Sequence, residues 1–234
     1  MKDKIEHVVV FPGLTGPNHP DHKPCYDLLR EHANRLGLTI TVVVHPGQAD
    51  ADGSVSGELC PDSAIKSAIA LLSNLEAEGK PYMTLGISFG CQVSLAAAQV
   101  LGVATFWKKS VLWGPIPHSN VWGAFGKGER DAGLGKGSRF ISSTENLYCQ
   151  HRALEHLLQS VKIPVTIALG TQDKYVPREY LLWLERVCES LPKPPFHTFV
   201  CIEGCGHTVK KTTDENWRVY LDMIFAGCNA HTDR

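Results

Sequence analysis

The stretch that decides the fold is Gly86-Ile87-Ser88-Phe89-Gly90, a G-x-S-x-G pattern. The apolar run 82–85 comes directly before it, and the helix-forming stretch 92–98 comes directly after it. A serine between a strand and a helix is held on a sharp turn, with its backbone in a strained region. The residues two before and two after it then crowd one another and the neighbouring strands, so both positions favour glycine. This context predicts an exposed nucleophile at Ser88, whereas the five-residue pattern alone would indicate no more than a turn.

Short apolar runs alternate with helical patterns on both sides of this motif. The runs are continuous, as is typical of strands buried on both faces of a parallel sheet. In the helical stretches, apolar residues recur on one face, as at Ile65, Ala68 and Leu72, which follow a Pro61 suited to a first helical turn. This alternation predicts an α/β fold with a doubly wound, mostly parallel sheet. The expected strands are 7–11, 38–44, 82–87, 110–113, 163–169 and 196–202.

One segment interrupts the alternation. No strand pattern occurs from Gly114 to about residue 160, and the stretch 123–137 contains six glycines. A capping box at Ser142 and Glu145 predicts a helix toward its end. Long irregular insertions in compact domains often act as lids or binding loops. We therefore interpret residues 1–234 as a single domain with 115–160 as a cap or lid, and a solvated surface loop as the alternative.

A serine nucleophile needs a general base, and the base needs an acid that orients it. Asp173 follows the run 163–169 in a loop with Gly170, and His207 follows the run 196–202 within a Gly-x-Gly-His sequence. The chain order Ser, Asp, His suits a nucleophile on a strand–turn–helix. All three residues follow the carboxyl ends of parallel strands, where ligands bind in open α/β folds. The sequence therefore predicts a catalytic triad of Ser88, Asp173 and His207.

Three other interpretations compete at these residues. Asp173 could simply cap the helix that follows it, and Glu203, four residues before His207, is a rival acid. The Glu203 side chain would have to reach back across its own loop, so Asp173 is the preferred acid. Cys201 and Cys205 near His207 could bind zinc, but their spacing is not C-x-x-C and no second pair exists. No metal and no other cofactor is predicted.

The tetrahedral intermediate of acyl transfer needs an oxyanion hole. One donor is expected to be the backbone N–H of Phe89, at the start of a helix whose dipole favours negative charge. The second should come from the glycine-containing loop after the first strand, and we assign it to Leu14. The N–H of Thr15 remains an alternative, because sequence does not fix which amide points inward.

With these motifs the chain resembles the α/β-hydrolase superfamily over nearly its whole length. The resemblance rests on the G-x-S-x-G at Ser88, the Asp173 loop, the Gly-x-Gly-His at His207 and the Pro12-Gly13 turn. It implies an α/β-hydrolase type of sheet, with Ser88 as nucleophile, His207 as general base and Asp173 as its orienting acid. The chain departs from the family pattern in two ways. We expect it to lack the usual first hairpin of the sheet, and the segment 114–160 is shorter than many caps of the family.

The predicted function is hydrolysis of a small-molecule carboxylic ester through an acyl-enzyme on Ser88. Aromatic residues at the insertion could line a pocket for an apolar or aromatic group: Trp113, Trp122, Phe125 and Phe140. The same triad would serve a thioesterase, an acyltransferase or a C–C bond hydrolase, and these alternatives stay open. A ligand-binding protein without turnover is a third hypothesis, which the complete triad disfavours.

Composition excludes several other classes. The 234 residues carry 23 Lys and Arg against 24 Asp and Glu, so the net charge of −1 gives no basic footprint for nucleic acid. No stretch approaches the roughly 20 apolar residues that cross a bilayer, and no secretory signal is recognised. Without such a signal, the eight cysteines are expected to be reduced thiols in a cytoplasmic protein. The sequence leaves the oligomeric state open.

Overall fold

The structure is a computed structural model that describes residues 4–57, 59–102, 104–115, 154–176, 178–190, 197–207, 214–226 and 228. Most of the predicted cap lies outside the described residues. The same is true of the capping box at Ser142 and Glu145 and of three aromatic residues assigned to a pocket, Trp122, Phe125 and Phe140.

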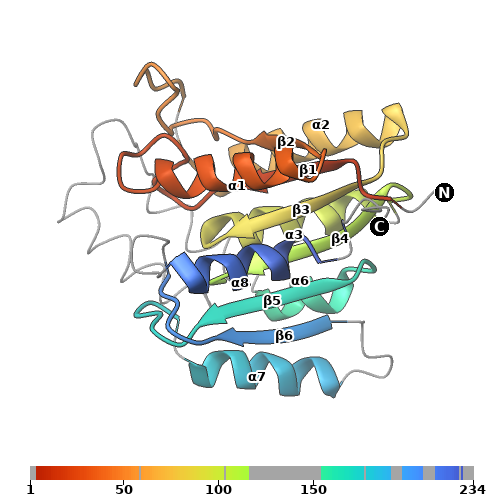
Figure 1. The fold of residues 1–234 in the computed structure, drawn as a ribbon. Helices are drawn as coiled ribbons and strands as arrows, with labels where there is room; N and C mark the ends of the chain where they lie inside the picture. The colour runs from red at the N-terminus through yellow and green to blue at the C-terminus, as the bar shows by residue number, and fades with distance from the viewer. Residues whose placement is uncertain are drawn as a thin grey trace, which may run out of the picture.

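In the described part of the chain, six parallel strands form one open sheet in the order β2-β1-β3-β4-β5-β6 (Figure 1). The strand order reverses between β1 and β3, which makes the space beyond their carboxyl ends the expected ligand-binding crevice of a doubly wound sheet. The strands are β1 His7–Phe11, β2 Thr39–Val42, β3 Tyr82–Ile87, β4 Trp107–Trp113, β5 Val165–Gly170 and β6 His197–Ile202.

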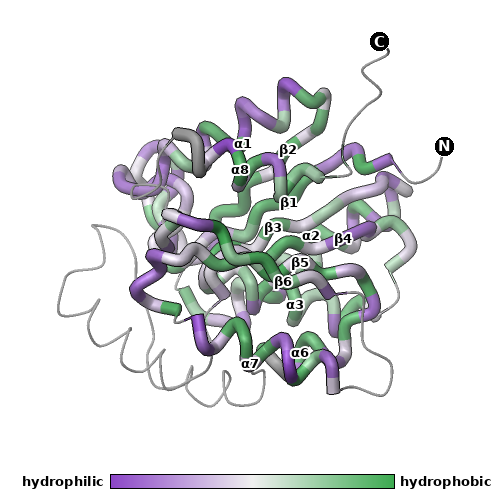
Figure 2. Tube along the Cα trace, turned by 60° about the horizontal axis from the view of Figure 1, so that its bottom comes forward, coloured by the Kyte–Doolittle hydropathy of each residue, from purple (hydrophilic) through white to green (hydrophobic). Residues whose placement is uncertain are grey.

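Helices cover both faces of the sheet and create two cores. Buried side chains of α1 and α8 pack on one face, and those of α2, α3, α6 and α7 pack on the other. The central strands run through the most hydrophobic part of the molecule (Figure 2), and all five residues of β1 are buried. The helices are α1 Lys23–Arg35, α2 Pro61–Glu78, α3 Phe89–Leu101, α6 Leu154–Ser160, α7 Arg178–Glu189 and α8 Asp214–Ile224.

The predicted doubly wound parallel sheet is confirmed, and the bounds of β1 and β3 are those expected from the sequence. Pro61 is the first residue of α2, where Cys60 and Ser63 cap the helix reciprocally. The strand β4 begins at Trp107, three residues earlier than predicted. The end of the segment interpreted as a cap forms α6, whose Leu154, Leu157 and Leu158 are buried in the same core as α3.

Candidate active site

Ser88 lies on the sharp turn between β3 and α3, at the carboxyl edge of the sheet. Its backbone has φ 53° and ψ −114°, and among the described residues it is the one non-glycine position with positive φ. Such a conformation is costly for a residue with a side chain, so the surroundings must enforce it. Only 7% of Ser88 is exposed, so the expectation of an exposed nucleophile is wrong for the described structure.

The two glycines of the motif explain how this turn is held. A Cβ on Gly86 would lie 2.6 Å from Cα of Cys91, in the first turn of α3. A Cβ on Gly90 would overlap the carbonyl of Phe11, the last residue of β1. The first glycine therefore lets strand and helix meet, and the second lets the helix pack against the adjacent strand, as the sequence pattern predicts.

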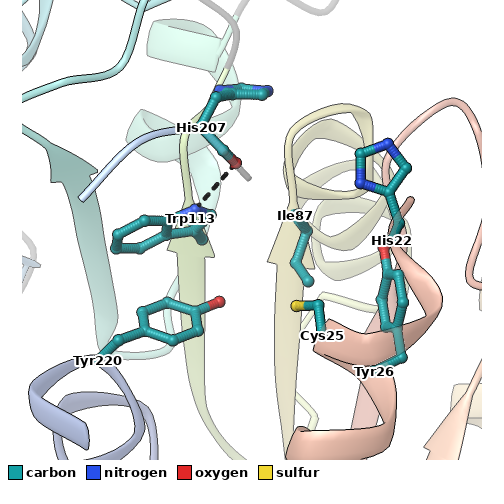
Figure 3. A pocket seen from close by; sticks show the side chains of 7 residues that line it. All are labelled: His22, Cys25, Tyr26, Ile87, Trp113, His207 and Tyr220. Carbon is teal, nitrogen blue, oxygen red and sulfur yellow. Dashed lines mark hydrogen bonds between the residues drawn. The ribbon is translucent and has the colours of Figure 1, made fainter. Parts of the chain in front are cut away.

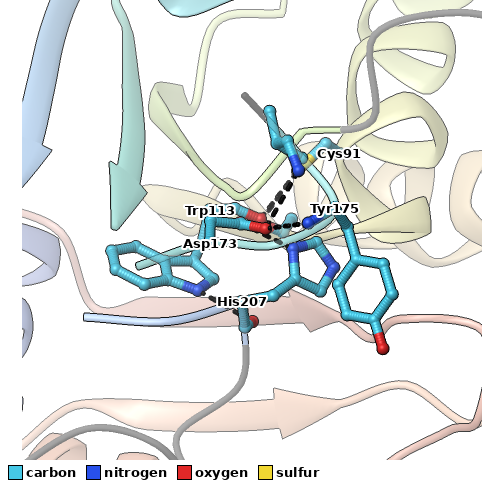
Figure 4. Close-up of polar contacts among 7 residues, drawn as sticks. Cys91, Trp113, Asp173, Tyr175 and His207 are labelled. Carbon is cyan, nitrogen blue, oxygen red and sulfur yellow. Dashed lines mark hydrogen bonds and ion pairs between the residues drawn. The ribbon is translucent and has the colours of Figure 1, made fainter. Parts of the chain in front are cut away.

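His207 and Asp173 form a hydrogen-bonded pair at the same edge of the sheet. Nδ1 of His207 lies 2.7 Å from Oδ2 of Asp173, and the two side chains are 8% and 0% exposed (Figure 4). The other carboxylate oxygen, Oδ1, accepts hydrogen bonds from the backbone N–H groups of Tyr175 and Val176 at 2.8 and 3.0 Å. The Asp173 carboxylate therefore has two partners: one oxygen stabilises the turn of its own loop, and the other binds the imidazole.

The rival acid lies elsewhere. Oε1 of Glu203 accepts a hydrogen bond from the hydroxyl of Thr171 at 3.2 Å, and this contact is exposed. Among the described residues, the carboxylate that contacts the His207 ring is Asp173. The structure therefore brings together the two residues that the sequence paired, Asp173 and His207.

Trp113, at the end of β4, connects this pair to the nucleophile turn. Its carbonyl accepts the N–H of Ser88 at 2.9 Å, and its indole Nε1–H donates to the carbonyl of His207 at 3.2 Å. The next residue, Gly114, has φ 55°, and a Cβ there would lie 2.8 Å from Nδ1 of His207 and 3.2 Å from Oδ2 of Asp173. Neither role was expected from the sequence, although Gly114 directly follows a predicted strand and could have indicated a close approach of the backbone to the site.

The imidazole has one ring nitrogen available for a second interaction. Nε2 of His207 is buried and has no hydrogen-bond partner among the described residues. Its Nδ1 is bound to a carboxylate, so the neutral ring carries its proton there and presents Nε2 as an acceptor. No hydrogen bond joins this nitrogen to Oγ of Ser88 in the structure, and catalytic hydrogen bonds of this kind often tighten only when substrate binds.

The two elements that carry the predicted oxyanion donors both adjoin Ser88. Phe89 is the first residue of α3, and the loop after β1 passes over the serine, since a Cβ on Gly13 would lie 3.5 Å from Cβ of Ser88. The N–H of Gly13 donates to the Tyr26 hydroxyl at 3.4 Å. Within the described part of the chain, the N–H groups of Leu14 and Thr15 donate to no protein acceptor. Both therefore remain candidates for the second donor.

A small cavity of about 30 Å³ lies beside His207, between the ends of the strands and the helices α1 and α8 (Figure 3). That volume is enough for a water molecule. Burial raises the pKa of the Cys25 thiol and of the Tyr26 hydroxyl, so both stay protonated near neutral pH. Cys25 is therefore a poor rival nucleophile. The cavity is lined by His22, Cys25, Tyr26, Ile87, Trp113, His207 and Tyr220.

The described residues contain no group of three side chains that could hold a metal ion. Cys201 is exposed and Cys205 is buried, although they are close in sequence. None of the helices in the described ranges is long and apolar enough to cross a bilayer. The cytoplasmic location remains a prediction.

Known proteins resemble this chain in structure but not detectably in sequence. No protein-family model and no curated protein matches the chain by sequence. Solved structures do match: a monoacylglycerol lipase from Paleococcus ferrophilus has a TM-score of 0.67 at 17% identity, covering 96% of both chains. Est1E from Butyrivibrio proteoclasticus with bound ferulic acid has a TM-score of 0.67 at 16% identity, covering 94% of this chain and 87% of its own. Mouse alpha/beta hydrolase domain-containing protein 10 has a TM-score of 0.66 at 19% identity, covering 96% and 90%. The chain therefore has the α/β-hydrolase fold.

Proposed function

We propose that this protein is a serine hydrolase that cleaves a carboxylic ester through an acyl-enzyme on Ser88. One observation carries the proposal. Ser88, which alone among the described non-glycine residues has a positive φ, lies at one edge of the sheet. The hydrogen-bonded pair of His207 and Asp173 lies at the same edge. A strained serine and a carboxylate-oriented imidazole with an unpaired Nε2 are the parts that acyl transfer requires.

In the acylation half-reaction, Oγ of Ser88 attacks the ester carbonyl while Nε2 of His207 accepts its proton. Asp173 holds the ring and stabilises the imidazolium that forms. The N–H groups of Phe89 and Leu14 stabilise the oxyanion, and each such donor is worth roughly 3 kcal/mol in the transition state. The C–O bond then breaks, and His207 returns the proton to the leaving alcohol.

In the deacylation half-reaction, water replaces the alcohol. His207 accepts a proton from the attacking water, whose oxygen adds to the acyl carbon. The second tetrahedral intermediate collapses, the carboxylic acid leaves, and the proton returns to Oγ of Ser88. The cavity beside His207 is large enough to hold such a water.

The surroundings of His207 support an apolar or aromatic substrate group. The Tyr175 ring packs edge-on against the imidazole with ring centroids 5.0 Å apart, and 46% of Tyr175 is exposed. Trp113 lines the small cavity beside His207. The names of two fold neighbours, a monoacylglycerol lipase and a protein with bound ferulic acid, fit small esters of this kind. We therefore propose a small ester with an apolar or aromatic acyl or alcohol group as substrate.

Labelling with a fluorophosphonate probe tests the site directly. We expect stoichiometric modification of Ser88, loss of labelling in Ser88→Ala and strongly slowed labelling in His207→Ala. The matched control is Ser94→Ala, because Ser94 lies on α3 and its buried hydroxyl contacts Thr84 and Ser110 rather than the site. Labelling that persists in Ser88→Ala would refute the nucleophile assignment. A panel of p-nitrophenyl esters and acyl thioesters of graded length then separates an esterase from a thioesterase.

A further inference from the structure

We infer that Gln48 is the positioning residue of the oxyanion hole, because it holds both peptide groups that could supply the second donor. The inference rests on the proposed function. Gln48 follows β2 in the chain, 34 residues or more from the loop that it contacts. It does not meet the reacting atoms, so its role would be exerted through the backbone of the loop after β1.

Three hydrogen bonds fix the Gln48 side chain. Nε2 donates to the carbonyl oxygens of Gly13 and Leu14, at 2.8 and 3.1 Å. Oε1 accepts the N–H of His45 at 3.0 Å. Only this orientation of the amide satisfies all three partners, because two are acceptors and one is a donor. Gln48 is 1% exposed, so water does not compete for these bonds.

Because a peptide group is rigid, holding its carbonyl oxygen also fixes the direction of its N–H group. In a trans peptide, C=O and the following N–H point in opposite directions within one rigid plane. The carbonyl of Gly13 shares its plane with the N–H of Leu14, and the carbonyl of Leu14 shares its plane with the N–H of Thr15. Turning both carbonyls toward Gln48 therefore turns both N–H groups away from it. Hydrogen bonds to the carbonyls also polarise these amides and make them stronger donors.

The packing around Gln48 leaves this arrangement little freedom. Gly16 has φ 79°, and a Cβ there would lie 3.0 Å from Cβ of Gln48, so the turn closes tightly over the side chain. His45, which anchors Oε1, is 1% exposed, and its ring lies against Phe11 and Phe89 with centroid distances of 6.2 and 5.9 Å. Gln48 is thus fixed relative to the end of β1 and the start of α3, the elements that carry both halves of the oxyanion hole.

The first test is Gln48→Met, which keeps the length of the side chain and removes both donors. For hydrolysis of p-nitrophenyl acetate we expect kcat to fall roughly 10- to 100-fold with KM little changed, because misplaced donors act on the transition state. The affinity for an aryl boronic acid, which forms a tetrahedral adduct on the serine, should fall by a similar factor. The acid limb of the pH profile should not move, since the His207–Asp173 pair is untouched.

The control is Asn18→Ala. Nδ2 of Asn18 donates to the carbonyl of Ala49 at 2.9 Å, so it joins the same two segments without holding the carbonyls of Gly13 and Leu14. This variant should lose stability but retain kcat and boronic acid affinity. An equal loss of kcat in both variants would overturn the inference, because loosening of the segments alone would then explain it.

A second variant, Gln48→Glu, keeps the inference testable if Gln48→Met fails to fold. The introduced carboxyl can donate one hydrogen bond when protonated, but when ionised it faces two carbonyl oxygens and donates none. We expect kcat to fall at high pH along a basic limb that the wild type lacks, with partial activity below it. A profile shaped like that of the wild type would refute the inference. The outcomes are distinguishable: a wild type unlabelled at Ser88 removes the proposed function, whereas a labelled wild type with fully active Gln48 variants removes this inference alone.

Discussion

Nδ1 of His207 and Oδ2 of Asp173 are 2.7 Å apart, with the carboxylate side chain wholly shielded from solvent. The two residues come from the loops that follow β5 and β6, which are neighbouring parallel strands. Because the carboxylate also accepts two backbone N–H groups through Oδ1, its position does not depend on the imidazole alone. A buried partner fixed in this way orients the ring and stabilises its protonated form.

The first prediction concerns this carboxylate. Asp173→Asn keeps the size of the side chain but removes the negative charge and presents an amide that can hold the ring in the wrong tautomer. We expect kcat for p-nitrophenyl acetate to fall about 1,000- to 10,000-fold, by analogy with the serine protease triad. Steady-state kinetics measure this change, and circular dichroism checks that the variant folds.

Glu203→Gln is the matched control, because Glu203 was the competing acid and contacts Thr171 instead. Its kcat should stay within about threefold of the wild type, as is usual for surface changes away from a site. A loss in Glu203→Gln as large as that in Asp173→Asn would contradict the assignment of the orienting acid.

The second prediction concerns Gly114. In Gly114→Ala the new methyl group would lie 2.8 Å from Nδ1 of His207, so the imidazole must move. A displacement near 1 Å in a catalytic group lowers turnover roughly 100-fold. Gly102→Ala is a close control, because Gly102 also has positive φ, 67°, but a methyl group there would meet no atom within 4 Å. Both variants should lose about 1 kcal/mol or more of unfolding free energy, and only Gly114→Ala should lose activity.

The third prediction concerns the link between the two halves of the site. Trp113→Phe removes the indole donor to the His207 carbonyl while keeping an aromatic ring. A buried carbonyl left without its donor costs about 1–3 kcal/mol, and the loop that carries His207 should become looser. We expect a drop in kcat of roughly tenfold and faster amide hydrogen exchange in the His207 loop. Unchanged exchange with unchanged kcat would mean that this hydrogen bond does not position the histidine.

Local patterns were sufficient for most of the fold and for the residues of the candidate triad. The strand β1 is fully buried, and β3 is buried at every residue except its last, Ile87. The glycines on either side of Ser88 are required by close backbone contacts, and the five-residue motif alone was enough to predict them. Asp173 and His207 could be placed because strand ends mark one edge of a parallel sheet. The two residues lie close together because β5 and β6, the strands that precede them, are neighbours in the sheet.

The features that the sequence did not reveal depend on contacts distant in the chain. The start of β4 was missed because Lys108 and Lys109 break its apolar run. The ammonium of Lys109 binds the carbonyls of Ile224 and Ala226 at the end of α8, more than 110 residues away. Gln48 likewise donates hydrogen bonds to carbonyls 34 and 35 residues away. No local periodicity records such contacts, so only the three-dimensional structure identifies them.

The fourth prediction concerns acid stability and the buried His45. Burial lowers the pKa of its imidazole to about 3, and neither ring nitrogen has a hydrogen-bond partner among the described residues. In the unfolded chain the pKa is near 6.5. Between these two values the unfolded state binds a proton that the folded state does not, so the free energy of unfolding decreases as the pH falls. Above pH 6.5 the effect vanishes, and the slope below it is at most about 1.4 kcal/mol per pH unit.

His45→Phe removes this titration while keeping a ring beside Phe11 and Phe89. Urea unfolding from pH 7.5 to pH 5 should show a decrease in unfolding free energy that is smaller in the variant than in the wild type, by roughly 2 kcal/mol. Comparing each protein with itself at pH 7.5 removes any constant effect of the larger side chain. His7, whose pKa is also lowered by burial, is present in both proteins, and its contribution cancels. Parallel curves over this range would show that His45 does not become protonated on unfolding, and would contradict its burial as a neutral ring.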